Sequence, residues 1–267
     1  MKCHRYHGRQ ASLPDPQLPW RQYASLYLRV LLMQADHAFY RLSIRGKNHA
    51  LHDFRVAVRQ LHTWFSMPSF VGEPDAKLLK KLKGCLKHTN RARDTVVHNR
   101  WLKKHGYHYR FRHHGDIAPA GWPKLRRRIR SAIDALGAGH SDADSSFATY
   151  AAIIRRLWLH SFILRLAAVH GADDAAIHRC RILAKRLRYL LEPLARSDRR
   201  LEQQVLALKR FQDHAGQLHD LAQLRMRLPS LPGVDDVIGQ ETAALFESFE
   251  LRYLQVAGRL PDDVAWL

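Results

Sequence analysis

The sequence lacks the short motifs that mark nucleotide-binding and metal-dependent enzymes. It contains no GxxxxGK[ST] loop for holding phosphates and no HExxH motif for holding a metal. Its three cysteines, Cys3, Cys85 and Cys180, include no CxxC pair, and their odd number favours reduced thiols in a cytoplasmic protein. We therefore expect no metal site and no cofactor.

Long apolar runs are also missing. No stretch approaches the ~18–20 apolar residues that are needed to cross a bilayer. The N-terminal segment MKCHRYHGRQASLPDPQLPW is basic but has no apolar core of the kind found in signal peptides. Alternating strand patterns are absent as well. These absences predict a helical protein that is cytoplasmic and is not inserted in a membrane.

Positive charge is what the sequence has in excess. It holds 44 Lys and Arg residues against 24 Asp and Glu residues, which gives a formal net charge of +20. Such a balance predicts a polyanionic partner, which is a nucleic acid, an anionic membrane or a phosphate polymer. From Asp235 onward the chain has seven acidic and two basic residues, so we do not expect the final helix to bind a polyanion.

One predicted helix concentrates cationic side chains on a single stripe. In HDFRVAVRQLHTWF, residues 52–65, offsets of 3, 7 and 10 residues place four side chains within an arc of ~80° on an α-helix. These residues are His52, Arg55, Arg59 and His62. Phe54, Val58 and Leu61 form a second, apolar stripe. We expect the helix to pack through the apolar stripe and to present the basic one.

The same pattern occurs again 126 residues later. In HRCRILAKRLRYLL, residues 178–191, the equivalent positions hold His178, Arg181, Lys185 and Arg188. The offset persists to Asp94 and Asp220, over more than 40 residues without a gap. We interpret this register as two structural repeats. A pseudo-twofold axis relating them would place both basic stripes in one groove, together with Lys83 and Lys209.

A further predicted helix adds cations to each repeat. In the first repeat, spacings of 3 and 4 residues keep several basic residues on or near one face. The added candidates are Lys80, Lys83, Lys87, Arg91 and Arg93 in the first repeat, and Lys209 and His219 in the second. A solvated surface is the common alternative for any one charged stripe. Agreement between two halves is not needed for solubility, so we favour an anion-binding site.

Periodicity and helix-breaking residues predict eight helices, arranged as two stacked four-helix bundles. The predicted ranges are a flexible arm at 1–19, a first four-helix repeat at 20–136, a linker at 137–146 and a second four-helix repeat at 147–267. One helix is expected to run unbroken over about residues 75–105. Asp174 and Asp198 are predicted N-caps, and Pro123 is predicted in the first turn of its helix.

These motifs resemble a known family. HDFRVAVRQL and HRCRILAKRLRYLLE, each followed by a Lys-bearing helix that ends in RD or HD, are similar to the CHAD domain (conserved histidine α-helical domain). LKRFQDHAGQLHD is similar to the second-half signature of that family. The resemblance covers about residues 20–260. It implies an all-α fold of two pseudo-symmetric four-helix bundles, which bind inorganic polyphosphate through a basic surface, and it suggests association with polyphosphate granules.

The residues favour binding over catalysis. Phosphoryl hydrolysis needs carboxylates to hold a metal and a base to activate water, and the basic stripes contain no paired Asp or Glu. The E-x-E-x-K strand of triphosphate tunnel enzymes is also missing. We expect a stand-alone polyphosphate-binding protein that is not an enzyme. The main alternative is a protein that binds the RNA or DNA backbone, since any basic groove attracts phosphates.

Three features allow two interpretations each. His52 and His178 either contact an anion or complete a hydrogen-bond network at a helix start, and anion contact predicts tighter binding toward pH 6. Asp94 and Asp220 either orient basic neighbours or, as we favour, form ion pairs or hydrogen bonds between helices. The loop at 107–114 alternates aromatic and basic residues, so it either contacts a ligand, by stacking on bases or by folding over a polyanion, or, as we favour, is an ordinary surface loop.

Overall fold

The structure, a computed structural model, describes residues 13–45, 48–68, 75–112, 115–139, 145–171, 173–228 and 233–254. The described residues form nine α-helices and a short π-helix, with no strand beyond one isolated bridge. In chain order these are α1 (Trp20–Arg45), α2 (Asn48–Phe65), α3 (Ala76–His88), α4 (Asn90–Lys104), α5 (Trp122–Ala138), α6 (Phe147–Ala167), α7 (Asp174–Leu191), α8 (Arg199–Arg227), α9 (Val234–Phe249) and η1 (Glu250–Leu254). The predicted all-α fold class is confirmed.

The contacts divide the chain into two compact units. The first unit comprises Met1–Thr89 and Asp116–Tyr150, and the second comprises Asn90–Gly115 and Ala151–Leu267. The first unit therefore holds α1, α2, α3 and α5, whereas α4 packs with the second unit. Packing and sequence repetition are different properties, so the predicted repeats at 20–136 and 147–267 and their pseudo-symmetric four-helix bundles stay predictions.

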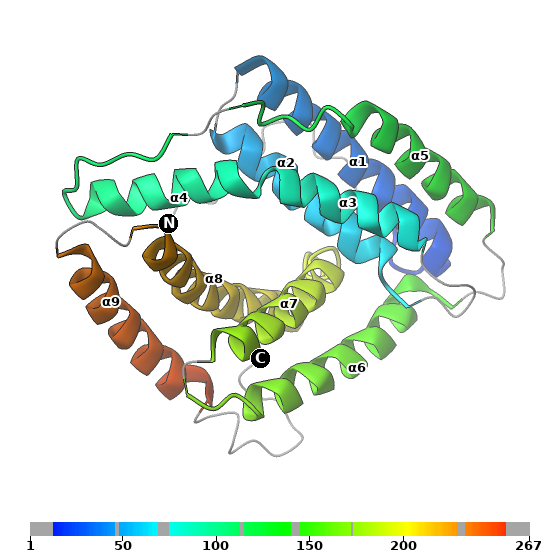
Figure 1. Ribbon diagram of the computed structural model, residues 1–267. Coiled ribbons are helices and arrows are strands. Elements are labelled where there is room, and N and C mark those ends of the chain that lie inside the picture. Colours follow the sequence, from blue (N-terminus) through cyan, green and yellow to red (C-terminus); the bar gives the residue numbers. More distant parts are fainter. Residues whose placement is uncertain are drawn as a thin grey trace. The chain divides into compact units, whose positions relative to one another are not determined.

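An aromatic core holds the first unit together. In it, α1 packs against α2 and α5 (Figure 1). Tyr23 of α1 stacks on Phe147 with 3.9 Å between ring centroids, and Phe54 of α2 meets Trp122 of α5 edge-on at 5.0 Å. Aromatic pairs of this geometry add stabilisation beyond the area that they bury. The core thereby fixes the orientation of α2, which carries the first basic stripe.

In the second unit, α8 packs against α4, α7 and α9. The α7 helix has half of its 18 residues buried, and Gln212 of α8 donates a hydrogen bond to the carbonyl oxygen of Ala184 at 3.1 Å. A separate apolar cluster joins α4, α8 and α9 through Leu102, Leu221, Leu224, Leu228, Val234 and Ile238. The buried residues of α7 and its hydrogen bond from Gln212 hold α7, which carries the second basic stripe, in a fixed rotation on α8.

The N-terminal ends of three helices test the sequence predictions. Asp198 accepts hydrogen bonds from the first turn of α8, so its predicted N-cap role is confirmed. Pro123 lies in the first turn of α5, also as predicted. The prediction for Asp174 was wrong by one residue. Asp173 caps α7 by accepting from the N–H of Ala176 at 3.0 Å, because its backbone is still extended whereas Asp174 is already helical.

The prediction of an unbroken helix over residues 75–105 was wrong, because the helix is interrupted at Thr89, between α3 and α4. The hydroxyl of Thr89 donates to the carbonyl oxygen of Leu86 at 3.0 Å. The guanidinium of Arg55 donates to the same carbonyl at 2.9 Å and to the Thr89 hydroxyl at 2.6 Å. Side chains that occupy the backbone acceptors of a turn interrupt the helical hydrogen-bond ladder.

The equivalent positions 126 residues later lie within one continuous helix. The residues 126 positions after Thr89 and Asn90 are Ala215 and Gly216, neither of which has a side-chain hydroxyl or amide. The α8 helix runs through both of them and reaches 29 residues. Spacing alone could not reveal the difference, because the basic residues on either side of Thr89 keep helical phase.

Two of the predicted boundary segments are only partly described. Residues 1–12 of the predicted arm and residues 140–144 of the predicted linker lie outside the described residues. The α5 helix extends to Ala138, two residues into the predicted linker. Among the described helices, none is both long and apolar enough to cross a bilayer.

Candidate anion-binding site

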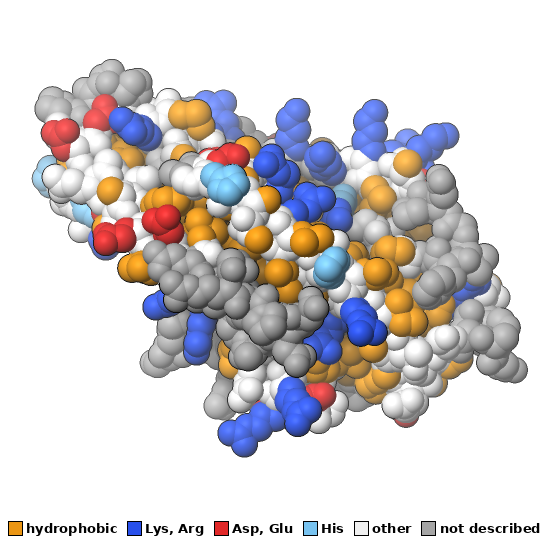
Figure 2. Space-filling view, turned by 90° about the horizontal axis from the view of Figure 1, so that it is seen from below, with side chains coloured by type: hydrophobic (Ala, Val, Ile, Leu, Met, Phe, Trp, Pro, Cys, Tyr) orange, Lys and Arg blue, Asp and Glu red, His pale blue; other side chains and the backbone are white. Residues whose placement is uncertain are grey.

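The surface is rich in cations. The face shown in Figure 2 carries many Lys and Arg side chains and few acidic ones. This agrees with the formal net charge of +20. The predicted site residues lie in both compact units, and each unit is described by itself below.

In the first unit, the stripe on α2 combines residues in different environments. Arg55 is only 7% exposed, and its guanidinium is engaged by the carbonyl of Leu86 and the hydroxyl of Thr89. Arg59, one turn later, is half-buried and forms no hydrogen bond or ion pair with any described residue. Arg55 therefore anchors the end of α3, whereas Arg59 keeps its charge available. His52 is exposed, and His62 is half-buried.

The α3 helix adds an exposed row of ammonium groups to the first unit. Lys80, Lys83 and Lys87 are all exposed, and their spacing keeps them within an arc of ~60°. Within the described part of the chain, none of the three forms an ion pair. The side chains of Leu78, Leu82 and Cys85 anchor the opposite side of the helix in the core. This row can follow an extended anion without first breaking an internal contact.

In the second unit, the α7 stripe is half-buried along its whole length. Arg181 lies against α8 at Gly216, where an added Cβ would be 3.2 Å from its Nη2 atom. Lys185 follows one turn later. Gly216 thus leaves room for the guanidinium beside the α8 backbone, which holds the Arg181 charge in place.

Two predicted histidines meet near the start of α7. The rings of His178 and His219 have centroids 5.2 Å apart, and Nδ1 of His219 lies 3.5 Å from a carboxylate oxygen of Asp174. Burial lowers the pKa of His178, and the positive charges of His219 and Arg181 lower it further, against a smaller opposing effect of Asp174. His178 is therefore mostly neutral at pH 7 until an anion approaches.

The C-terminal part of the stripe is partly neutralised. Arg188 forms an ion pair with Glu192, one turn later on the chain, at 3.2 Å. Its guanidinium also lies 4.8 Å from the centre of the Tyr189 ring. Lys209 on α8 is half-buried and has no ion pair among the described residues. Lys209 is thus more available to an anion than Arg188.

Arg93 belongs to a network that joins α4 to α8 within the second unit. It donates two hydrogen bonds to Asp220, at 2.7 and 2.8 Å, and one to Asp94 at 3.1 Å. Arg227 lies 3.6 Å from Asp94. The favoured interpretation of Asp94 and Asp220 as partners in contacts between helices is confirmed. Arg91, two residues before Arg93, is exposed and carries no such contact among the described residues.

One pair of arginines was missed from the sequence. Arg186 on α7 is half-buried, and burial together with the positive charge of Arg165 on α6 lowers its pKa. No carboxylate of the described residues forms an ion pair with either residue. The repeat hid this pair, because the residue 126 positions before Arg186 is Gln60. A search for Arg residues outside the repeated positions would have found it.

The loop at 107–114 is described as far as Arg112, and residues 113 and 114 lie outside the described residues. The backbone of Phe111 exchanges two hydrogen bonds with the side chain of Asn99, at 2.8 and 2.9 Å. Tyr107 and Phe111 pack against the apolar cluster of the second unit. Tyr109 remains 47% exposed. Most of the aromatic surface of the described loop therefore packs within its own unit.

Thiol and metal chemistry have little support in the described residues. Cys85 and Cys180 are buried and unpaired, and burial raises their thiol pKa values to about 12 and about 11. Both thiols therefore stay protonated near neutral pH. The described ranges contain no group of three or more His, Cys, Asp or Glu residues that could hold a metal ion.

Comparison with known families found one model that matches most of the chain. The family model of the CHAD domain matches residues 29–229. The chain belongs to the CHAD family. The resemblance seen in the repeated motifs is confirmed. A search of curated proteins found no match.

A solved CHAD structure supports the fold. The crystal structure of the CHAD domain from the plant Ricinus communis matches with a TM-score of 0.70 and 17% identity, covering 97% of this chain and 98% of that chain. PptA from Streptomyces chartreusis matches with a TM-score of 0.47 and 19% identity, over 90% of this chain and 98% of that chain. The first comparison shows that the α-helical CHAD fold extends over nearly the whole chain.

Proposed function

We propose that this CHAD protein binds inorganic polyphosphate through the basic faces of its two units. The observation that carries the proposal is the basic stripe that occurs on both α2 and α7, together with the exposed lysines of α3, which form no ion pair with a described residue. Membership of a family associated with polyphosphate binding supports the same ligand.

The chemistry of the side chains suits a phosphate chain. Arg presents a planar fork that can donate two hydrogen bonds at once, and Lys supplies a compact charge on a flexible stem. Arg181 on Gly216 supplies a positioned group, and Lys80, Lys83 and Lys87 supply adaptable ones. Helices that are already fixed by a core lower the entropic cost of ordering the site upon binding.

We propose further that the protein is a binding module and not an enzyme. Two acidic residues close to the basic positions are engaged by cations, in the pairs of Asp220 with Arg93 and Glu192 with Arg188. Carboxylates engaged in this way do not form the open pair that would hold a catalytic metal. A role at polyphosphate granules would follow from binding to the polymer.

A competition titration tests the ligand. Labelled long-chain polyphosphate is bound at physiological salt and is then challenged with duplex DNA, single-stranded RNA or short phosphates. We expect polyphosphate to bind at least ~10-fold more tightly per phosphate than either nucleic acid, because its charge density is higher and it has no bases to exclude from the site.

Two outcomes separate the hypotheses. If nucleic acid displaces the label as readily as unlabelled polyphosphate does, the basic faces form a general nucleic-acid backbone site, and the proposal is wrong. In that case Tyr109→Ala, in the loop after α4, should weaken RNA binding by removing an exposed ring on which a base can stack. Unchanged RNA binding by this variant would place the RNA contacts elsewhere.

A further inference from the structure

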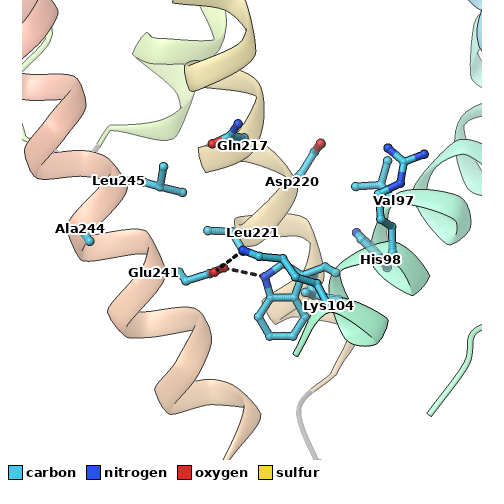
Figure 3. A pocket seen from close by; sticks show the side chains of 12 residues that line it. Val97, His98, Lys104, Gln217, Asp220, Leu221, Glu241, Ala244 and Leu245 are labelled. Atoms are coloured by element: carbon cyan, nitrogen blue, oxygen red, sulfur yellow. Dashed lines mark hydrogen bonds and ion pairs between the residues drawn. The ribbon is translucent and has the colours of Figure 1, made fainter. Parts of the chain in front are cut away.

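The second unit contains a pocket of about 580 Å³ between α4, α8 and α9. Its walls are mostly apolar, with Val97 and Trp101 from α4, Leu221 and Leu224 from α8, and Ala244 and Leu245 from α9. Figure 3 shows Leu221, Ala244 and Leu245 around this space. The pocket is large enough for a small organic molecule.

A carboxylate bridge holds one side of the pocket. Glu241 of α9 accepts hydrogen bonds from Trp101 at 2.6 Å and from Lys104 at 3.2 Å, and Figure 3 shows the contact with Lys104. Glu241 also forms a hydrogen bond with His105 at 2.9 Å. Burial tends to raise the pKa of Glu241, but these bonds outweigh it and lower the pKa. The bridge joins α9 to α4, and its charge is already satisfied by neighbouring groups.

Of the other charged groups described at the pocket, one positive charge has no described partner. Asp220, on the pocket wall, is engaged by two hydrogen bonds from Arg93. Arg100 is exposed at the pocket and forms no hydrogen bond or ion pair with a described residue. Gln217 also lines the pocket and has a side-chain amide without a described partner. Among the described lining residues, a ligand would therefore meet one cation and one amide that have no partner, next to apolar walls.

A buried histidine adds an independent sign of polar chemistry here. His98 lines the pocket and is only 1% exposed (Figure 3). Neither of its ring nitrogens has a hydrogen-bond partner among the described residues. A buried polar group without a partner is costly, and a ligand or water molecule that reaches it recovers that cost.

We propose that this pocket binds a small amphipathic anion, with an apolar or aromatic body among the leucines and a single charged head beside Arg100. The body would gain from leaving water, and Gln217 would supply a hydrogen bond to it or to the head. A polyphosphate chain does not fit this description, because every unit is charged and gains nothing from apolar walls. The site is thus distinct in chemistry from the basic stripes.

The test uses 8-anilinonaphthalene-1-sulfonate, an aromatic molecule with one negative charge, and the full-length protein. We expect saturable binding of one probe per chain. Ala244→Trp and Leu245→Trp, which fill the pocket, should each abolish it. Arg100→Ala should weaken it about fivefold, whereas Lys103→Ala, which removes an exposed charge from the same helix outside the pocket, should not. Circular dichroism and thermal unfolding check that the variants are folded.

The results decide between clear alternatives. Binding that is unsaturable, or that survives in a folded pocket-filling variant, overturns the proposal. Displacement of the probe by adenosine monophosphate would indicate nucleotide-like ligands, and displacement by octanoate would indicate short fatty acids. If neither compound displaces the probe, the assignment of an organic anion as the ligand is wrong. Polyphosphate affinity of Ala244→Trp should equal that of the unmodified protein, so failure here is separate from failure of the polyphosphate proposal.

Discussion

On α2, the guanidinium of Arg55 is buried against the end of α3, whereas Arg59, one turn later, has no hydrogen bond to a described residue. The two positions are equivalent in charge and in helical phase. Their environments differ because only Arg55 faces the break at Thr89. A repeated basic residue can therefore support the fold in place of contacting a ligand.

The first prediction concerns this pair of arginines. Arg55→Ala should lower the free energy of unfolding by about 2–3 kcal/mol, because it removes two charge-assisted hydrogen bonds, to Leu86 and Thr89, from a buried position. Arg59→Ala should change stability by less than about 0.5 kcal/mol but should weaken polyphosphate binding. Urea unfolding and a binding titration measure the two effects. Equal losses of stability would contradict the structural role of Arg55.

The second prediction concerns His98 and acid stability. Burial lowers the pKa of His98 to about 4, against an ordinary value of 6.5. Between these values the unfolded chain binds a proton that the folded protein does not, so stability falls as the pH drops from 6.5 toward 4. From pH 7 to pH 5 this residue should account for a loss of about 2 kcal/mol.

His98→Leu tests this directly, because leucine keeps an apolar side chain at the site but does not titrate. Urea unfolding at pH 7 and pH 5 should show a smaller acid-induced loss in the variant than in the unmodified protein. His170→Leu, at an exposed position, is the matched control and should leave the loss unchanged. The same acid-induced loss in both variants would show that His98 is not the residue responsible.

The third prediction concerns the pH dependence of binding at His178. Its pKa is lowered in the free protein by burial and by neighbouring positive charges. A bound polyanion offsets those charges and favours the protonated ring, so binding takes up a proton and strengthens as the pH falls below 6.5. His178→Gln should flatten the dependence between pH 7.5 and 5.5. An identical profile in the variant would exclude His178 from the site.

At the scale of elements, the positions of the helices were largely predictable and the break in the third was not. Apolar spacing located α1, α2 and α5, because a core imposes a 3.6-residue period on the chain. The end of α3 depends on a contact between Arg55 and Thr89, which are 34 residues apart. The periodicity of a sequence describes each helix separately, so it cannot predict a contact between residues of different helices.

The candidate site was likewise predictable only in part. The residue types and phases of the basic stripes were readable from the repeat, but their exposure was not. The pocket residues His98, Trp101 and Glu241 gave no signal, because they come from separate helices and share no motif. Glu241 lies in the acidic final helix, which its charge had led us to exclude as a polyanion-binding element.

The fourth prediction compares two basic helices of the first unit. The triple substitution Lys80→Ala, Lys83→Ala and Lys87→Ala on α3 should weaken polyphosphate binding by about tenfold or more, because it removes three exposed charges from one face. The control removes three exposed charges from α5 through Lys124→Ala, Arg127→Ala and Arg130→Ala. Its expected effect is much smaller. Equal effects would mean that only total charge matters.

At the scale of the whole molecule, which has a net charge of +20, the number of phosphates that the basic residues neutralise governs how binding responds to salt. The fifth prediction is that raising salt from 50 to 200 mM weakens polyphosphate binding by roughly a hundredfold or more, because many counterions are released on association. Binding of the single-charged probe in the α4–α8–α9 pocket should change far less. Salt titrations of both ligands on one protein sample make the comparison. A polyphosphate affinity that does not change with salt would indicate that the natural ligand is not a polyanion.

The backbone passes between the two compact units at three places, after Thr89, Gly115 and Tyr150. A chain divided after Gly139 would leave Arg93 in one fragment and its partner Asp220 in the other. The second fragment would also retain Phe147, which fills the core of the first unit. The predicted repeats and the compact units therefore have different borders. Either half of this sequence, expressed alone, would lack residues that complete the packing of a unit.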